Sequence, residues 1–296
     1  MTSSRAFQIS GYTQFAYTCW DKGTDTYAIK RARLTLSGEL VKNIRYRMQV
    51  DAVKSPMLID FEVDFIFRPS FSLKIGQYYV PFSLENRTSD SEMDTINRSQ
   101  VVDGLAPGRD IGAQGRDIGA MAVGKFSIFE YMAGVFNGAG INRLDTNESK
   151  DFGARVVVRP AKFLAVGASI YDGRHTPTQG GPEVSRDRVG LEAFLTLGSA
   201  TVKSEFISGK DDRTRKSGWY LQGLYNFMPK KLQAVVKWDS YDGDKDLSAD
   251  RTDLFTLGGN WFFAEKTKLM VNYGLYRKEG KGTTSWAIFV QFQAGF

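Results

Sequence analysis

Hydrophobic and polar residues alternate one by one along most of this chain. In the segment 266–277, Leu269, Val271 and Tyr273 share one face, and Lys268 lies on the other. Successive side chains of a β-strand point to opposite faces, so this pattern predicts strands with one apolar and one polar face. Sixteen segments show the pattern, approximately at 6–19, 26–40, 43–54, 57–68, 70–80, 112–124, 126–136, 151–159, 161–172, 187–197, 199–209, 216–227, 231–241, 252–263, 266–277 and 284–296.

The connections between these segments alternate in length. Those at one end are turns of a few residues, whereas those at the other end are mostly longer and rich in Gly, Asp, Asn, Ser and Thr. Bacterial outer-membrane barrels have this layout, with an even number of strands of about 9–11 residues. We therefore predict an all-β fold, a single transmembrane antiparallel β-barrel over residues 1–296. Both termini then lie at the short-turn end.

A soluble β-sandwich or propeller would also show alternation, because its apolar faces point toward a core. Two features favour the membrane barrel. Large aromatic residues such as Phe61, Trp238 and Trp261 lie on the apolar face near strand ends, and charged residues occur on the opposite face of nearly every strand. The chain also ends on an alternating apolar face that includes Phe292 and Phe296. This ending looks like the carboxyl-terminal signal by which bacterial barrels are recognised for assembly.

Composition excludes several other classes of protein. The chain has 39 Lys and Arg against 33 Asp and Glu, mixed along its length, and no basic block of the kind that binds nucleic acid. Aromatic residues make up 13%, which excludes a disordered chain, and the single Cys excludes a disulfide framework. No apolar run is long enough for a transmembrane helix. We expect secretion through the inner membrane on a signal peptide that is absent from this sequence.

Six stretches of the chain, taken in order, match one known family. They are IKRARLTLSGEL at 29–40, LKIGQYYVPFSLEN at 73–86, GRDIGAM at 115–121, EYMAGVFNGAG at 130–140, WYLQGLYNF at 219–227 and TLGGNWFF at 256–263. On these stretches the chain resembles the phosphate-selective porin O and P family of Gram-negative outer membranes. The resemblance implies a sixteen-stranded homotrimer among outer-membrane lipid and lipopolysaccharide. It also implies that the third extracellular loop, about 81–111, folds into the lumen as a constriction.

The parity of each strand assigns charged side chains of both signs to the pore wall. A wall of fixed positive charge raises the local concentration of anions in a narrow channel. The nine candidate cations are Arg31, Arg33, Arg45, Arg47, Lys74, Arg155, Arg188, Lys203 and Lys237. The candidate acids on the same face are Asp51, Asp60, Glu62, Asp64, Glu130, Glu192, Glu205 and Asp239.

Two observations oppose a strongly anion-selective wall. If the second and third strands turn near 41–42, Arg33 faces Asp51 and Glu39 faces Arg45, and such pairs stabilise a sheet by about 0.2–1 kcal/mol. The predicted constriction loop also carries many acids. These acids either face the lumen or bind loop backbone amides, as Asp does in turns. The charged residues of the loop are Glu85, Arg87, Asp90, Glu92, Asp94, Arg98, Asp103 and Arg109, followed by Asp110.

We therefore predict a passive diffusion channel for small ions and polar solutes, with a possible weak preference for anions or phosphate. The alternative is a structural or partner-holding barrel, which sheaths another protein or offers an adhesion or phage-docking surface. No enzyme activity, cofactor or metal site is predicted. The single His175 lies in a polar loop without a catalytic pattern around it, and the acids at 239–245 lack the terminal Glu and helices of an EF-hand.

One local feature stands outside this scheme. The sequence GRDIGAQGRDIGAM at 108–121 contains a near-copy of itself after seven residues. An odd shift along one strand would turn the two copies to opposite faces. We therefore expect the first copy to lie in the loop or in an extension of the strand.

Overall fold

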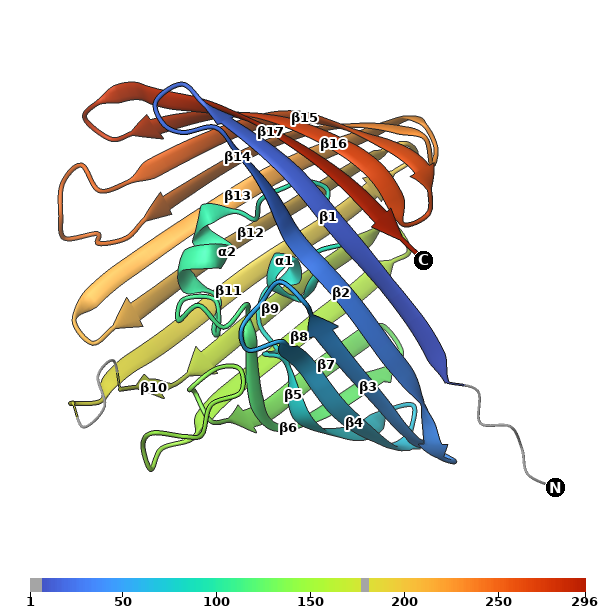
Figure 1. The fold of residues 1–296 in the computed structure, drawn as a ribbon. Helices are drawn as coiled ribbons and strands as arrows, with labels where there is room; N and C mark the ends of the chain where they lie inside the picture. The colour runs from blue at the N-terminus through green and yellow to red at the C-terminus, as the bar shows by residue number, and fades with distance from the viewer. Residues whose placement is uncertain (1–6, 177–180) are drawn as a thin grey trace.

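The computed structural model describes residues 7–176 and 181–296, apart from the side chains of residues 283 and 284. Its strands form one closed antiparallel barrel (Figure 1). Each strand of the wall pairs with the next wall strand in sequence, and β1 (Gln8–Trp20) closes the ring by pairing with β17 (Gly282–Gly295) as well as with β2 (Thr26–Val41). Seventeen strands are described, and all but the two-residue β10 (Arg174–His175) belong to the wall. The predicted sixteen-stranded barrel is confirmed.

The remaining elements follow in chain order. The strands before the long loop are β3 (Ile44–Asp51), β4 (Leu58–Arg68) and β5 (Phe71–Tyr79), and the loop contains the short helices α1 (Leu84–Arg87) and α2 (Gln100–Leu105). The strands after it are β6 (Arg116–Phe126), β7 (Phe129–Phe136), β8 (Asp151–Ala161), β9 (Leu164–Asp172), β11 (Val184–Leu197), β12 (Ala200–Asp211), β13 (Thr214–Met228), β14 (Leu232–Asp242), β15 (Thr252–Ala264) and β16 (Thr267–Lys278).

Strand boundaries differ from the predicted ones in a few places. The strand predicted at 43–54 ends at Asp51, and the one predicted from 112 begins at Arg116. At the second site the backbone turns, because Gly112 and Gly115 both have positive φ angles, of 76° and 80°. The first predicted strand started at residue 6, which lies outside the described residues.

The outer surface of the barrel is apolar and carries aromatic residues at both strand ends. Trp219 and Trp238 stack edge to face near the loop end of β13 and β14. Trp261 and Phe263 stack near the turn end of β15. Two aromatic girdles around an apolar band are the lipid-facing surface of an outer-membrane barrel. Within the described residues, no helix is long and apolar enough to cross a membrane.

The register of the first strands orders their charged side chains. Arg33 lies opposite Asp51 and Glu39 opposite Arg45, as the turn at 41–42 predicted. The pairing of β1 with β2 contains one irregularity, because Gln14 faces Arg31 while the next residue of β1 faces Ile29. The extra residue in this β-bulge is Lys30, and a bulge re-aims a side chain that strict alternation would place on the other face.

The connection between β5 and β6 lies within the barrel in Figure 1, where α1 and α2 are enclosed by the strands. Its apolar side chains pack against inward-facing residues of the wall, and this cluster is buried. The loop contributes Val80, Phe82, Val101, Val102, Leu105 and Ala106, and the wall contributes Tyr78, Met121, Phe136, Tyr171, Ile207 and Tyr220. The apolar cluster therefore joins the loop to strands on several sides of the barrel.

Candidate functional site: the loop and wall inside the barrel

Side chains of the wall hold the backbone of the loop between residues 91 and 97. Their nitrogens donate hydrogen bonds to loop carbonyl oxygens, so inward polar residues on five strands fix one loop segment. The pairs are Gln293 with Ser91 (3.2 Å), Lys268 with Met93 (2.6 Å), Asn260 with Asp94 (2.8 Å), Lys30 with Ile96 (3.3 Å) and Lys237 with Asn97 (3.1 Å). In the reverse sense, Asn272 Oδ1 accepts a hydrogen bond of 2.8 Å from the backbone N–H of Ile96.

Two carboxylates reach across between the loop and the wall. The side chain of Asp94 accepts hydrogen bonds from Lys203 (2.6 Å) and from Gln222 (2.9 Å). In the other direction, Glu205 of β12 accepts from the backbone N–H groups of Leu84 (2.9 Å) and Glu85 (2.7 Å), where α1 begins. These charged hydrogen bonds are stronger than neutral ones and set the position of the loop.

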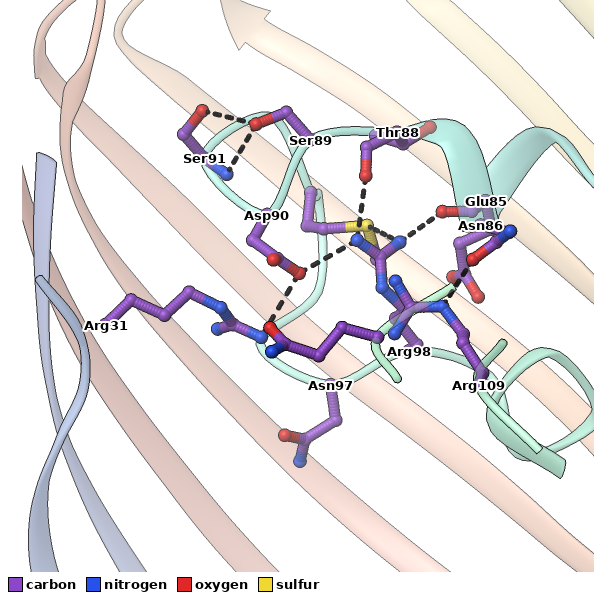
Figure 2. Close-up of polar contacts among 12 residues, drawn as sticks. Arg31, Glu85, Asn86, Thr88, Ser89, Asp90, Ser91, Asn97, Arg98 and Arg109 are labelled. Atoms are coloured by element: carbon purple, nitrogen blue, oxygen red, sulfur yellow. Dashed lines mark hydrogen bonds and ion pairs between the residues drawn. The ribbon is translucent and has the colours of Figure 1, made fainter. Parts of the chain in front are cut away.

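Asp90 lies among three arginines, of which Arg31 and Arg98 are labelled in Figure 2. Its Oδ1 is 3.1 Å from Arg31 Nη2 and 2.8 Å from Arg98 Nη2, and its Oδ2 is 2.8 Å from Arg33 Nη1. Its side chain is only 5% exposed. Two of the arginines come from β2 and the third from the loop itself. We call this group, Asp90 with Arg31, Arg33 and Arg98, the arginine cradle.

The cradle determines the protonation of Asp90. Burial by itself would raise the pKa of the Asp90 carboxyl, but the charges of Arg31, Arg98 and Arg33 outweigh burial and hold that pKa well below its ordinary value. Asp90 is therefore ionised at neutral pH and neutralises part of the charge around it.

A cavity of about 150 Å³ adjoins the cradle. It is lined by charged side chains that include Lys30 and Arg109, and Arg109 Nε donates 2.6 Å to Asn86 Oδ1 (Figure 2). Burial, together with repulsion from Arg98, lowers the pKa of Arg109 to about 10, so it stays protonated at neutral pH. Among the described residues, Arg98 Nε and Arg109 Nη2 are buried without a hydrogen-bond acceptor.

The structure divides the nine candidate cations of the wall into two groups. The first group is buried against acids of the loop or wall and against backbone oxygens, so its members do not line the open lumen, in contrast to the prediction. It consists of Arg33, Arg155, Arg188 and Lys237. The reason is that the loop and the paired strands cover them. The side chains of Arg31, Arg47, Lys74 and Lys203 keep between 20% and 34% of their surface exposed, and Arg45 is exposed.

Most of the exposed cations are also ion-paired. Arg47 Nη1 lies 2.5 Å from Asp60, Lys74 Nζ lies 2.5 Å from Glu62 and Lys203 Nζ lies 2.6 Å from Asp94. Several of the predicted wall acids are themselves buried. Those acids are Asp51, Asp60, Glu205 and Asp239, whereas Glu62, Asp64, Glu130 and Glu192 keep partial exposure.

The loop residues fall into three kinds. Glu85 binds a backbone amide, since its Oε2 accepts from Ser99 N at 2.8 Å. Asp90, Asp94 and Asp110 bind cations instead, and Asp110 lies 3.0 Å from both Arg186 and Arg188. Of the others, Arg87 donates to the carbonyl of Tyr79, Asp103 pairs with Arg109 at 3.4 Å, and Glu92 is exposed.

The two copies of the tandem sequence have different partners. In the first copy, Asp110 binds arginines of β11, and the backbone turns. In the second, Asp117 of β6 accepts from the backbone N–H groups of Gly138 (2.7 Å) and Gly140 (3.2 Å). The Asp of the repeat therefore forms ion pairs as a loop residue in the first copy and accepts backbone hydrogen bonds as a wall residue in the second.

Sequence reasoning missed the uncharged residues that hold the loop, above all Gln14, Asn260 and Gln293. Gln14 Nε2 donates to the carbonyl oxygen of Asp90 (3.1 Å) and to Gln293 Oε1 (2.8 Å). Their positions in the strand alternation place them on the inward face, and amides recur on the polar faces of the first and last strands. This pattern was a usable signal for residues that hold the loop. Lys30 could not be found this way, because the bulge in β2 breaks the parity.

The aromatic residues predicted as an assembly signal lie at the carboxyl end of the chain, on β17 and just after it. Phe292 and Phe296 are exposed on the outer side, and the backbone of Phe296 bonds with that of Gly11 in both directions (3.2 and 3.0 Å). In the described part of the chain, no group of three or more His, Cys, Asp and Glu is arranged to hold a metal ion.

A closed barrel with aromatic girdles, a polar inner wall and a long loop inside defines an outer-membrane β-barrel of the porin class. The family described as phosphate-selective porin O and P matches residues 10–186 and 178–287. The two matches together span most of the chain, and the chain belongs to this family. No curated protein matches it.

Solved structures share the fold over the full length. OmpT, an outer membrane protein of Vibrio cholerae, has a TM-score of 0.74 at 12% identity, over 100% of this chain and 99% of that one. Its trimer form has a TM-score of 0.69 at 13% identity, over 99% and 100%. OmpF of Salmonella typhi, in complex with daunomycin, has 0.73 at 9% identity, over 99% and 98%. DcaP, an outer membrane channel of Acinetobacter baumannii, has 0.70 at 10% identity, over 100% and 99%.

Proposed function

We propose that this porin is a passive diffusion channel for small polar solutes and ions, with only a weak preference for anions. Membership of a porin family supports the diffusion channel. The observation that carries the weak preference is the pairing of wall cations with acids. Solutes move down their concentration gradients, so the proposal needs no cofactor, energy input or catalytic step.

Ion pairing limits the selectivity because a paired charge has a short-range field. Arg47, Lys74 and Lys203 each lie within 2.6 Å of a carboxylate oxygen. Exposed charges are also screened by salt over about 8 Å at physiological ionic strength. The excess of positive charge, a formal net charge of +6, leaves a small bias toward anions.

The same proposal includes the location and assembly of the protein. Its outward-facing aromatic residues support a location among outer-membrane lipid and lipopolysaccharide, which it would reach after secretion on a signal peptide. The trimer form of the similar OmpT structure supports a homotrimer. The loop inside the barrel would set the size limit of the pore as a constriction.

The inner wall counts against the alternative of a barrel that sheaths another protein. The loop already covers inward residues such as Ile207, Tyr220 and Asn260, which are buried. A partner chain would have to displace the loop from its apolar cluster. Stoichiometric co-purification of a second chain from native membranes would support the sheath instead.

The test is the reversal potential of the purified protein in a planar lipid bilayer under a KCl gradient, repeated with added phosphate. We expect conductance, a small anion preference and no block by low phosphate. Absence of conductance would contradict the diffusion channel. Strong anion selectivity with block by low phosphate would contradict the weak preference.

A further inference from the structure

The arginine cradle has the composition of an anion-binding site, yet its occupant belongs to the chain. Three guanidinium groups, from Arg31, Arg33 and Arg98, lie within 3.1 Å of one carboxylate. Guanidinium groups are the protein groups best suited to bind carboxylate and phosphate. Asp90 fills the position that such a ligand would take.

The backbone of Asp90 is fixed independently of its carboxylate. Its carbonyl oxygen accepts the hydrogen bond from Gln14, and the neighbouring Ser91 carbonyl is held by Gln293. Replacing the carboxylate by an amide would therefore remove the negative charge while leaving these anchors in place.

The groups next to the cradle favour an anion once Asp90 is neutral. The adjoining cavity of about 150 Å³ is lined by Lys30, Arg31, Arg98 and Arg109 as well as by Asp90 and Asp103. Arg98 Nε and Arg109 Nη2 have no acceptor among the described residues. Buried N–H groups of charged side chains are costly to leave unpaired.

We propose that Asp90 is the residue that determines the weak ion selectivity of this porin, because its carboxylate occupies the arginine cradle as an internal counter-ion. The inference rests on the proposed diffusion function. Its negative charge thereby offsets the positive charge of the cradle, in which Arg33 is also paired with Asp51 at 3.1 Å. Arg31, with 21% of its side chain exposed, is the member of the cradle that solutes can reach.

The experiment compares Asp90→Asn with the native chain by reversal potential under a KCl gradient, with and without inorganic phosphate. We expect the anion-to-cation permeability ratio to rise by roughly threefold to tenfold, the effect of one uncompensated charge over several ångströms of partly aqueous space. Phosphate should then reduce the chloride current of Asp90→Asn only. Asp90→Glu, which restores the charge, should keep the native ratio.

Asp103→Asn is the matched control, because it removes one acid from the same loop. The Asp103 side chain is 57% exposed, and its one ion pair within the described residues is with Arg109 at 3.4 Å. We expect its permeability ratio to change much less than that of Asp90→Asn. Equal changes in the two variants would mean that total charge decides the selectivity, and they would overturn the proposal.

A second variant covers the case in which Asp90→Asn does not fold. Arg31→Gln removes the exposed cation and keeps Asp90, so the permeability ratio should shift toward cations. An unchanged ratio would overturn the proposal. If the native protein conducts with weak selectivity and neither variant shifts it, only this inference fails. If the native protein does not conduct, the proposed function itself fails.

Discussion

The loop is held in the barrel by apolar contacts as well as by charges, and Phe82 tests the apolar part. Its side chain is completely buried, and it belongs to the cluster formed with Val101, Leu105 and inward residues of the wall. The ring also lies close to β11, since a Cβ added at Gly190 would be 3.1 Å from Phe82 Cζ. Phe82→Ala would leave a cavity between the loop and the wall.

The size of the effect follows from this burial. A buried Phe removes about 150–250 Å² from water, worth roughly 4–6 kcal/mol at about 25 cal/mol per Å². Measured Phe→Ala substitutions in cores cost about 3–5 kcal/mol. Phe82 loses these contacts when the loop detaches from the wall, so Phe82→Ala destabilises the attached loop relative to the detached one. At about 1.36 kcal/mol per factor of ten, we expect the equilibrium constant for loop detachment in Phe82→Ala to rise roughly 100-fold to several thousand-fold.

Hydrogen–deuterium exchange followed by mass spectrometry measures that equilibrium on loop peptides in the folded, detergent-solubilised barrel. We expect faster exchange across residues 84–106 and unchanged exchange in the strands. Phe227→Ala is the control, because this Phe is 61% exposed on the outer face and does not touch the loop cluster. Native-like exchange of the loop in Phe82→Ala would refute the reasoning.

Three further predictions concern the folded state, and unfolding in urea with intrinsic fluorescence measures each. Gly115→Ala should destabilise the fold more than Gly112→Ala. Both glycines have a positive φ, which costs an alanine about 1–2 kcal/mol, but only at Gly115 would the new Cβ lie 1.9 Å from Oδ1 of Asn86 in α1. Equal losses would contradict the steric clash. Arg155→Gln should cost about 3–5 kcal/mol by stranding the carboxylate of Glu192, whose side chain is only 6% exposed, and Glu192→Gln in addition should recover most of that loss. No recovery would mean that Arg155 acts through its contacts rather than its charge. The Asp90 pKa is depressed in the folded state, so its stabilisation is present above the unfolded value of about 3.9 and is lost below it; the loss in Asp90→Asn should be the same at pH 7 and pH 5. A loss that disappears at pH 5 would show that Asp90 is already protonated there, so that its folded-state pKa is raised rather than depressed.

The barrel could be predicted from the sequence because one physical rule acts on every strand. Each strand faces lipid on one side and polar surroundings on the other, so alternation marks both the strands and their inward residues. The register of Arg33 with Asp51 followed from one short turn. These properties are local, and a single sequence contains them.

The interior of the site could be predicted only in part, because it depends on where the loop goes. Parity identified Lys237 and Arg188 as inward residues, but it did not show that loop atoms would bury them. The partners of Asp90 come from β2 and from within the loop, and nothing in the spacing of these residues brings them together. Amides such as Gln14 show the same limit, since their role depends on one carbonyl of the loop.

The bulge in β2 has a consequence for how barrels of this kind change. A single extra residue, Lys30, adds a cation beside Arg31 without lengthening the barrel or adding a strand. The alternation of the rest of the strand, and with it the lipid-facing surface, is preserved. Insertion or deletion of one residue in a strand can therefore alter the charge of a pore's interior independently of its outer surface. Two related porins could differ in lumenal charge at such a position while every neighbouring residue is the same.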